Sequence, residues 1–358
     1  MNGDRGHIAE LMPRVNNWFE FPAVQRDMIE DDVRISKYES AIAASVRSGD
    51  VVLDLGTGTG ILAFLALRAG ARKVYAIERA DIIEVARENA FRNGLADQIE
   101  FIKEDSRFVS LRQKVDCVVS EIIGHLALEE NMLDALVDAR ERFLTSTGRM
   151  VPLGVDLYFA PTSYDGVYNR EIAAWNVPRA GFDMSAGYAL ATNNVYVQSL
   201  PPDSLIASPK RGANIDLERV SRVSVRCCVD FSIAQESRMT GFAGWFKAEL
   251  APGIALDTSP NAPSTHWGQC FLPIRQPCMV SPGDLVSLDF SSKSLVDDVV
   301  YEWTVSLWRG ADAVEPVARF EHSTSCFVNR DSLDRFWQRS RRRGSPRPKQ
   351  MLAQLALR

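Results

Sequence analysis

The stretch VVLDLGTGTGILAFLALRAGARKVYAIE, residues 51–78, decides the fold of this chain. An apolar run, VVLDL, enters a glycine-rich turn. An apolar helix follows and ends at Gly70, and the run KVYAIE then closes on an acidic residue. Such a succession predicts a strand, a helix and a second, parallel strand. The same alternation continues through DIIEVARENAFRNG (81–94), IEFIKED (99–105), VDCVVSE (115–121) and a helix to about Phe143, and it predicts a Rossmann-like, doubly wound α/β sheet.

The pattern changes near Pro152. Beyond it the runs are short, alternating and rich in threonine, valine and aromatic residues, as in VSRVSVRCCVDFSI (220–233) and YEWTVSLW (301–308). Alternation of this kind is typical of antiparallel β structure. We therefore expect a helical cofactor lid at 1–50, a Rossmann-like cofactor domain at 51–152, a β-barrel substrate domain at 153–330 that carries an inserted helical arm at 164–196, and a basic, flexible tail at 331–358.

Bulk composition excludes several classes of protein. The chain has 358 residues, of which 46% are hydrophobic, but no apolar stretch reaches the roughly 18 residues of a membrane span. The first residues, MNGDRGHIAELMPR, lack the apolar segment of a secretory signal, so we expect a cytoplasmic protein without membrane partners. Six scattered cysteines without a CxxC pair, together with four histidines, indicate reduced thiols and no metal site. A net charge of -5 argues against nucleic acid as a partner.

The glycines of DLGTGTG lie between a predicted strand and the helix after it. Without side chains at Gly56, Gly58 and Gly60, a ligand can approach the backbone amides, and Asp54 begins the motif. Nicotinamide enzymes use a related loop, but theirs usually reads GxGxxG, whereas Ile61 directly follows Gly60 here. The loop therefore favours a cofactor with an adenosyl group.

Two acidic residues follow at the ends of the next strands. Glu78 closes KVYAIE, where a carboxylate can accept hydrogen bonds from both hydroxyls of a ribose. Asp105 closes the next strand, where we expect the adenine. Each has a simpler interpretation as a solvated acid at a strand end.

Two glutamates, Glu121 and Glu130, lie at the two ends of the loop that follows the predicted strand VDCVVSE. Glu121 ends the strand at the sheet edge where ligands of open α/β folds bind, and the chain bends at Gly124 before it reaches Glu130. Two carboxylates on one short loop repel each other unless a cation lies between them, and a planar guanidinium satisfies both. As an alternative, Glu129 and Glu130 only cap the helix that follows.

Three separated motifs resemble one known family, the protein arginine methyltransferases. SEIIGHLALEENML (120–133) resembles its double-glutamate loop, STHWGQ (264–269) its threonine-histidine-tryptophan loop, and RDMIEDDVRISKY (26–38) its N-terminal helix over the cofactor. With DLGTGTG and Glu78, the resemblance covers roughly residues 19–310.

The resemblance implies S-adenosyl-L-methionine as the cofactor and an arginine in a protein or peptide as the methyl acceptor. Arg34 would pair with the methionine carboxylate of the cofactor, and Met28 and Met132 would flank the target nitrogen. The implied catalytic residues are Glu121, Glu130, His266 and Asp31. The implied cofactor-binding residues are Met28, Arg34, Asp54, Gly56, Gly58, Gly60, Glu78, Asp105 and Glu121. The implied substrate-binding residues are Phe19, Met28, His125, Met132, His266 and Trp267. The arm at 164–196 would form a homodimer.

The chain also departs from the family pattern. Phe19 and its aromatic neighbours stand where tyrosines are common, His125 stands where a tyrosine is usual, and Ile122 and Ile123 replace a tryptophan and a methionine. These changes reshape the acceptor pocket, so free L-arginine or another small guanidine stays open as an alternative substrate, and the pattern of mono- or dimethylation stays open as well. A third hypothesis is a catalytically silent, cofactor-binding scaffold, against which the two glutamates and His266 speak.

Overall fold

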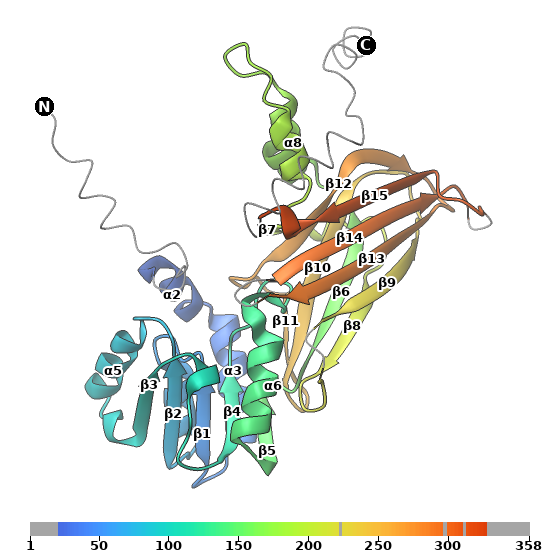
Figure 1. Cartoon of the computed structure of the whole chain (residues 1–358). Coiled ribbons are helices and arrows are strands. Elements are labelled where there is room, and N and C mark those ends of the chain that lie inside the picture. The colour runs from blue at the N-terminus through green and yellow to red at the C-terminus, as the bar shows by residue number, and fades with distance from the viewer. Residues whose placement is uncertain (1–20, 222–223, 296–298, 311–312, 328–358) are drawn as a thin grey trace, which may run out of the picture.

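A computed structural model describes residues 21–221, 224–295, 299–310 and 313–327 of the chain (Figure 1). Phe19, which was predicted to bind substrate, and the basic tail at 331–358 lie outside the described residues. Within the described ranges, no helix combines the length and the apolar character that a bilayer span requires.

The first half of the chain forms the predicted parallel sheet. Its five strands lie in the order β3-β2-β1-β4-β5, and every pair is parallel. The strands are β1 (Val51–Leu55), β2 (Lys73–Glu78), β3 (Ile99–Lys103), β4 (Val115–Ser120) and β5 (Leu144–Val151). Helix α4 (Ile61–Arg68) packs on β1 and β2, α5 (Ile83–Arg92) on β3, and α6 (Met132–Phe143) on β4 and β5.

The strand order reverses between β1 and β4. Leu55 and Ser120 are register partners at the ends of these two strands, so Gly56 and Glu121, the next residues in the chain, leave the sheet at the same point. A crevice opens at such a switch point because the two connections run to opposite sides. The glycine loop and the first glutamate of the carboxylate loop are therefore neighbours.

The N-terminal segment forms two helices where the sequence predicted one continuous helical stretch. Helix α2 (Pro22–Ile29) ends two residues before α3 (Asp32–Ser45) begins. Asp31 separates them because its Oδ1 accepts a hydrogen bond from the backbone N of Arg34, at 2.9 Å, and so caps α3. Helix α3 packs on α4 and also contacts β10 and β11 of the second half, so it joins the two parts of the fold.

The second half is antiparallel and barrel-like, as predicted. One sheet has the order β7-β12-β10-β6-β8, with β11 paired to β10, and the other has the order β15-β14-β13-β9. Their strands are β6 (Gly154–Thr162), β7 (Tyr196–Gln198), β8 (Lys210–Asp216), β9 (Arg226–Ser232), β10 (Ser237–Ala251), β11 (Ile254–Asp257), β12 (Gln269–Val280), β13 (Leu285–Ser294), β14 (Val299–Trp308) and β15 (Ala318–Ser323). The two sheets face each other, since the rings of Phe159 and Phe290 are 4.9 Å apart and those of Phe231 and Phe242 are 5.5 Å apart.

A helical excursion separates β6 from β7 and projects away from the barrel (Figure 1). It contains α7 (Asp165–Val167), a π-helical turn η5 (Tyr168–Ile172), η6 (Ala173–Asn176) and α8 (Ala186–Ala191). At its base, the hydroxyls of Tyr168 and Tyr188 lie 2.8 Å apart, and both donate to the backbone carbonyl of Arg275 on β12. Near its outer end, Arg179 and Phe182 exchange two backbone hydrogen bonds across a tight turn.

Candidate active site

A cavity of about 1680 Å³ lies at the carboxyl end of the parallel sheet. Its lining residues come from the lid helices, the glycine loop, the end of β2, the segment after β3, the loop after β4, α6, the turn before β12 and the end of β13. These segments are far apart in sequence, so only the folded chain brings them together. Of the predicted site residues whose side chains are described, the cavity wall contains Met28, Asp31, Arg34, Gly56, Gly58, Glu78, Asp105, Glu121, His125, His266 and Trp267.

The glycine loop is shaped by close packing. Hydrogen bonds from the amides of Gly56 and Thr57 to the carbonyl of Ile77 fix the loop to β2. Gly56 and Gly58 have φ values of 75° and 52°, which favour glycine. A Cβ on Gly56 would lie 2.5 Å from the Ile122 side chain, so this position has no room for one. At these two glycines the loop therefore presents backbone atoms, and no side chains, to the cavity.

Gly60 is not among the residues of the described chain that line the cavity. Its φ is 93°, and a Cβ there would lie 2.8 Å from the ring of Phe64. The residue starts α4 in a conformation that favours glycine, which accounts for its place in the motif without a ligand contact.

Asp54 lies behind the loop instead of facing the cavity, although it was predicted to bind the cofactor. It is completely buried, and its Oδ2 accepts a hydrogen bond of 2.6 Å from the hydroxyl of Thr57. Burial raises the pKa of Asp54 to about 7, against the lowering effect of the Thr57 hydrogen bond. Because the end of β1 is buried on both faces, the side chain supports the loop from below.

Glu78 holds the turn that follows β2. Its Oε2 accepts from the amide of Gly58 at 3.2 Å, and its Oε1 accepts from the amide of Ala80 at 3.0 Å. Asp105 lies farther along the same edge and forms an ion pair with Arg107 at 2.6 Å. The hydrogen bond from Arg107 lowers the pKa of Asp105, so this side chain is a carboxylate.

Arg34 and Glu121 form a buried ion pair in the cavity wall. Nη2 and Nε of Arg34 lie 2.5 and 2.6 Å from Oε2 of Glu121, and Nη1 donates to the carbonyl of Met28 at 3.0 Å. Burial alone would lower the pKa of Arg34, but the charge of Glu121 raises it above its ordinary value. The sequence did not predict this pair: it assigned Arg34 to the cofactor carboxylate, whereas here its guanidinium bonds a protein carboxylate.

Asp31 connects the lid to the turn before β12. Its Oδ2 lies 2.9 Å from the backbone N and 2.9 Å from Nδ1 of His266, while its Oδ1 caps α3. Burial acts to raise the pKa of Asp31, but the hydrogen bonds from His266 and Arg34 outweigh it and hold the pKa below its ordinary value. Asp31 is thus an anion, and Nδ1 of His266 donates to it.

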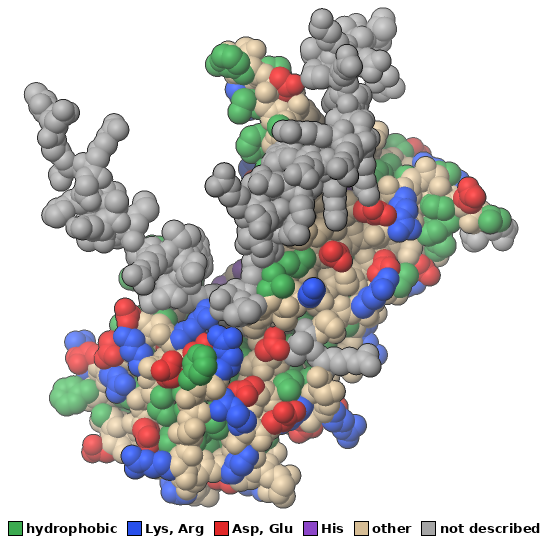
Figure 2. Space-filling model, in the orientation of Figure 1, with side chains coloured by type: hydrophobic (Ala, Val, Ile, Leu, Met, Phe, Trp, Pro, Cys, Tyr) green, Lys and Arg blue, Asp and Glu red, His purple; other side chains and the backbone are tan. Residues whose placement is uncertain are grey.

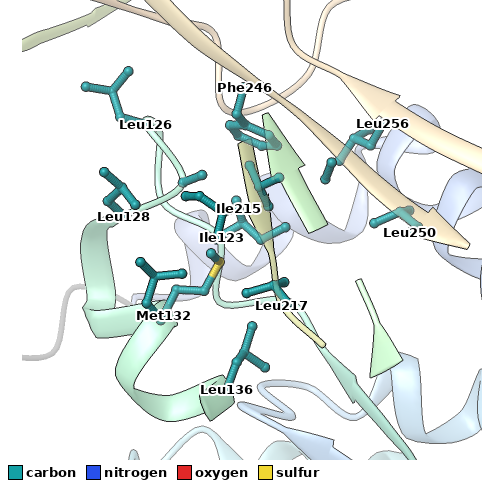
Figure 3. Close-up of a cluster of buried hydrophobic side chains, with 14 of the residues drawn as sticks. Ile123, Leu126, Leu128, Met132, Leu136, Ile215, Leu217, Phe246, Leu250 and Leu256 are labelled. Carbon is teal, nitrogen blue, oxygen red and sulfur yellow. The ribbon is translucent and has the colours of Figure 1, made fainter. Parts of the chain in front are cut away.

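The loop after β4 rests on an apolar cluster between the sheet and the barrel. Figure 3 shows Ile123, Leu126 and Leu128 of this loop beside Met132 and Leu136 of α6 and Phe246, Leu250 and Leu256 of the barrel. Met132 is fully buried in this cluster and is not among the lining residues of the described chain, although it was predicted to flank the target nitrogen. An apolar side chain at the start of α6 gains more from the cluster than from a polar cavity.

The second glutamate of the predicted pair, Glu130, is the middle residue of the short turn η4 (Glu129–Asn131) before α6, but its side chain lies outside the described part of the chain. The sequence did not single out Glu129 as a site residue. Its Oε2 accepts from the amide of Leu126 at 2.9 Å, and it lines the cavity. The adjacent acidic pair was the only signal that could have identified it. Among the described residues, no group of three or more potential ligands could hold a metal ion.

Comparisons with known proteins place the chain among methyltransferases. A family model described as the arginine methyltransferase oligomerization subdomain matches residues 155–309, and one described as ribosomal protein L11 methyltransferase (PrmA) matches residues 37–155. Protein arginine N-methyltransferase 6 of Danio rerio is 33% identical over 267 residues, which cover 70% of this chain and 75% of that protein. Protein arginine N-methyltransferase PRMT10 of Oryza sativa subsp. japonica is 32% identical over 303 residues, which cover 75% and 80%.

Solved structures share the whole fold. The crystal structure of Arabidopsis thaliana protein arginine methyltransferase 10 has a TM-score of 0.75 at 26% identity and covers 86% of this chain and 99% of that one. The Trypanosoma brucei PRMT1 enzyme-prozyme complex, which contains AdoHcy, has a TM-score of 0.78 at 22% identity, with coverage of 85% and 99%. The sequence identity and coverage of the curated relatives show that this chain belongs to the protein arginine N-methyltransferase family.

Proposed function

We propose that this chain transfers methyl groups from S-adenosyl-L-methionine to a guanidinium nitrogen of arginine in proteins or peptides. The observation that carries the proposal is the position of Glu121. Its carboxylate is buried in the wall of the cavity that the glycine loop also lines, and both leave the sheet at the point where the strand order reverses. A methyl donor on the glycine loop and a cation on Glu121 would therefore share one cavity.

The glycine loop fits the adenosyl part of the cofactor. The backbone at Gly56 and Gly58 is open to the cavity, and Glu78 lies at its rim with both oxygens near the loop, where ribose hydroxyls would reach them. Asp105 would lie near the adenine. When bound, the cofactor supplies an electrophilic methyl group on a positively charged sulfur.

Glu121 has a free position for a second guanidinium. Within the described part of the chain, Arg34 bonds to Oε2, and the contact of Oε1 is a long one of 3.3 Å with the amide of Ile123. An arginine substrate is protonated at any working pH, so the site must orient it instead of waiting for its free base. Charge-assisted hydrogen bonds that the guanidinium donates to Glu121 and Glu130 would draw positive charge toward two nitrogens and aim the third at the methyl group.

His266 would close the pocket from the barrel side. Since Nδ1 donates to Asp31, the other ring nitrogen is an acceptor in the neutral ring, and it would take the proton that the guanidinium loses after transfer. Met28 lines the same cavity and would contact the acceptor side chain.

The arm at 164–196 would dock on the cofactor domain, residues 51–152, of a second copy and form a homodimer. Its exposed apolar side chains include Trp175, Val177, Phe182 and Met184. Figure 2 shows hydrophobic side chains on the projecting part. Val85 and Phe91 on α5 are also exposed and offer an apolar surface on the cofactor domain. The match of the chain to an oligomerization subdomain supports this assembly.

Incubation with labelled donor tests the activity and separates its substrates. The acceptors are an arginine-containing peptide, the same peptide with lysine in place of arginine, and free L-arginine. We expect label in the arginine peptide alone, in line with the names of the relatives. Label in free L-arginine alone would replace protein arginine with a small guanidine as the substrate. No transfer to any acceptor, with cofactor bound, would support a silent scaffold.

A further inference from the structure

Two reciprocal hydrogen bonds join the loop after β4 to the turn before β12. The indole Nε1 of Trp267 donates to the carbonyl of Ile123 at 2.6 Å. In return, Nδ1 of His125 lies 2.7 Å from the carbonyl of Trp267. The partners are 144 and 142 residues apart in sequence, so these bonds form only when the cofactor sheet and the barrel are in place.

The bond to Trp267 fixes the tautomer of His125. A carbonyl oxygen has no proton to donate, so Nδ1 must carry the hydrogen at this distance. The other nitrogen is then the unprotonated one in the neutral ring. A tyrosine at this position would place its hydroxyl beyond the ring, so it could not reproduce a donor next to the Cγ atom.

The two bonds lie between the groups that the proposed reaction uses. Ile123 donates its amide to Oε1 of Glu121 at 3.3 Å, and its carbonyl receives the Trp267 indole. The ring of His266 packs on that of Trp267 with centroids 3.8 Å apart. Trp267 is only 2% exposed, so little water is available to replace a lost partner of its carbonyl. These two bonds, here called the clasp, therefore connect the loop that carries Glu121 to the turn that carries His266.

We propose that His125 is a positioning residue: through Nδ1–H it holds the turn with His266 against the loop with Glu121. This inference rests on the proposed arginine methylation. It assigns His125 a role through the Trp267 backbone, where the sequence assigned it to substrate contact. Loss of this bond lets the two loops separate, and a misplacement of about 1 Å costs on the order of a hundredfold in rate.

A matched pair of variants tests which nitrogen matters. In His125→Asn the side-chain amide nitrogen takes the place of Nδ1, whereas in His125→Gln it takes the place of Nε2. With saturating arginine peptide, we expect kcat to fall about tenfold to a hundredfold in His125→Gln and to recover most of that loss in His125→Asn, with an unchanged Kd for the donor in both. Equal kcat values for the two variants, or full activity of His125→Gln, would overturn the assignment.

Nuclear magnetic resonance of the wild type gives a second test, which uses a variant only to assign the signal of His125. The chain has four histidines, so ¹⁵N-labelled imidazoles give few signals, and the one that His125→Asn removes belongs to His125. We expect the tautomer with hydrogen on Nδ1, and a neutral ring with hydrogen on Nε2 would overturn the proposal. Methylation by the wild type is measured in the same preparation. Absence of methylation would refute the proposed function. Methylation together with hydrogen on Nε2 of His125 would refute only the positioning role of His125.

Discussion

Arg34 and Glu121 are joined by two short contacts, although 87 residues separate them and both side chains are less than a tenth exposed. Removal of one charge from such a pair leaves the other buried without compensation, at a cost of about 3–5 kcal/mol. We therefore expect Glu121→Gln to lower the free energy of unfolding by about that amount, as well as to stop methyl transfer. Denaturant unfolding monitored by circular dichroism measures it.

The matched control for this variant is Glu100→Gln. Glu100 pairs with Lys73 at 2.6 Å, but their side chains are 36% and 28% exposed, so the loss should be about 1 kcal/mol or less. Equal losses of unfolding free energy in the two variants would contradict the claim that breaking the Arg34–Glu121 pair leaves a buried, uncompensated charge.

Asp31→Asn separates the two tasks of Asp31. Asparagine caps helices as well as aspartate does, so α3 keeps its first turn and the Tm should fall less than in Asp31→Ala. The variant loses the anion that accepts from Nδ1 of His266, and we expect kcat to fall about tenfold to a hundredfold. Asp31→Ala should lower both kcat and Tm. An Asp31→Asn enzyme with wild-type kcat would contradict the role of the Asp31–His266 pair.

The raised pKa of Asp54 predicts the direction in which stability changes with pH. Its folded pKa of about 7 lies above the ordinary value of 3.8, so the folded state favours the neutral acid. As pH rises from about 4 to about 7, the unfolded chain ionises first, and wild-type stability should fall relative to that of Asp54→Asn. Unfolding of both proteins across this range measures the difference. A difference that is constant with pH would show that the pKa of Asp54 is not raised.

The projecting arm predicts an effect on assembly. Phe182 is 70% exposed near the outer end, and Phe182→Asp would replace an apolar contact with a charge. Burial of such a side chain contributes about 1.5–3 kcal/mol, so the Kd for dissociation of the dimer should rise at least tenfold. Analytical ultracentrifugation measures it. Val314→Asp is the control, since Val314 is 94% exposed and lies in the loop between β14 and β15 instead of in the arm. Equal assembly of both variants and the wild type would exclude the arm as the interface.

The sequence predicted the parts of this protein that depend on local pattern. The strand that ends at Glu78 and the glycine loop follow from hydrophobic runs and turn residues, and the structure has both. The break between α2 and α3 was missed because the helical composition continues through it, while the capping bond of Asp31 depends on side-chain geometry. A sequence pattern indicates helical composition more directly than it indicates such a cap.

Contacts over long sequence separations could not be predicted. The pairs Arg34–Glu121 and His125–Trp267 form only when distant segments meet, and nothing in the local sequence specifies them. Met132 was assigned to the pocket through the family resemblance, and the local pattern could not correct this because an apolar residue beside a loop fits a core and a cavity wall equally well. In the structure, packing against the barrel places Met132 in the core, and the sequence does not reveal this packing.

The most direct test of the account is a single-turnover experiment with Glu130→Gln at saturating donor and arginine peptide. Loss of one carboxylate of the pair leaves the substrate cation poorly compensated, so methyl transfer should slow by about several hundred-fold or more while the Kd for the donor is unchanged. Glu129→Gln is measured beside it, since its remaining oxygen can still accept from Leu126, and it should lose much less. Methyl transfer by Glu130→Gln at the wild-type rate would contradict the claim that a pair of carboxylates directs the methyl group to arginine.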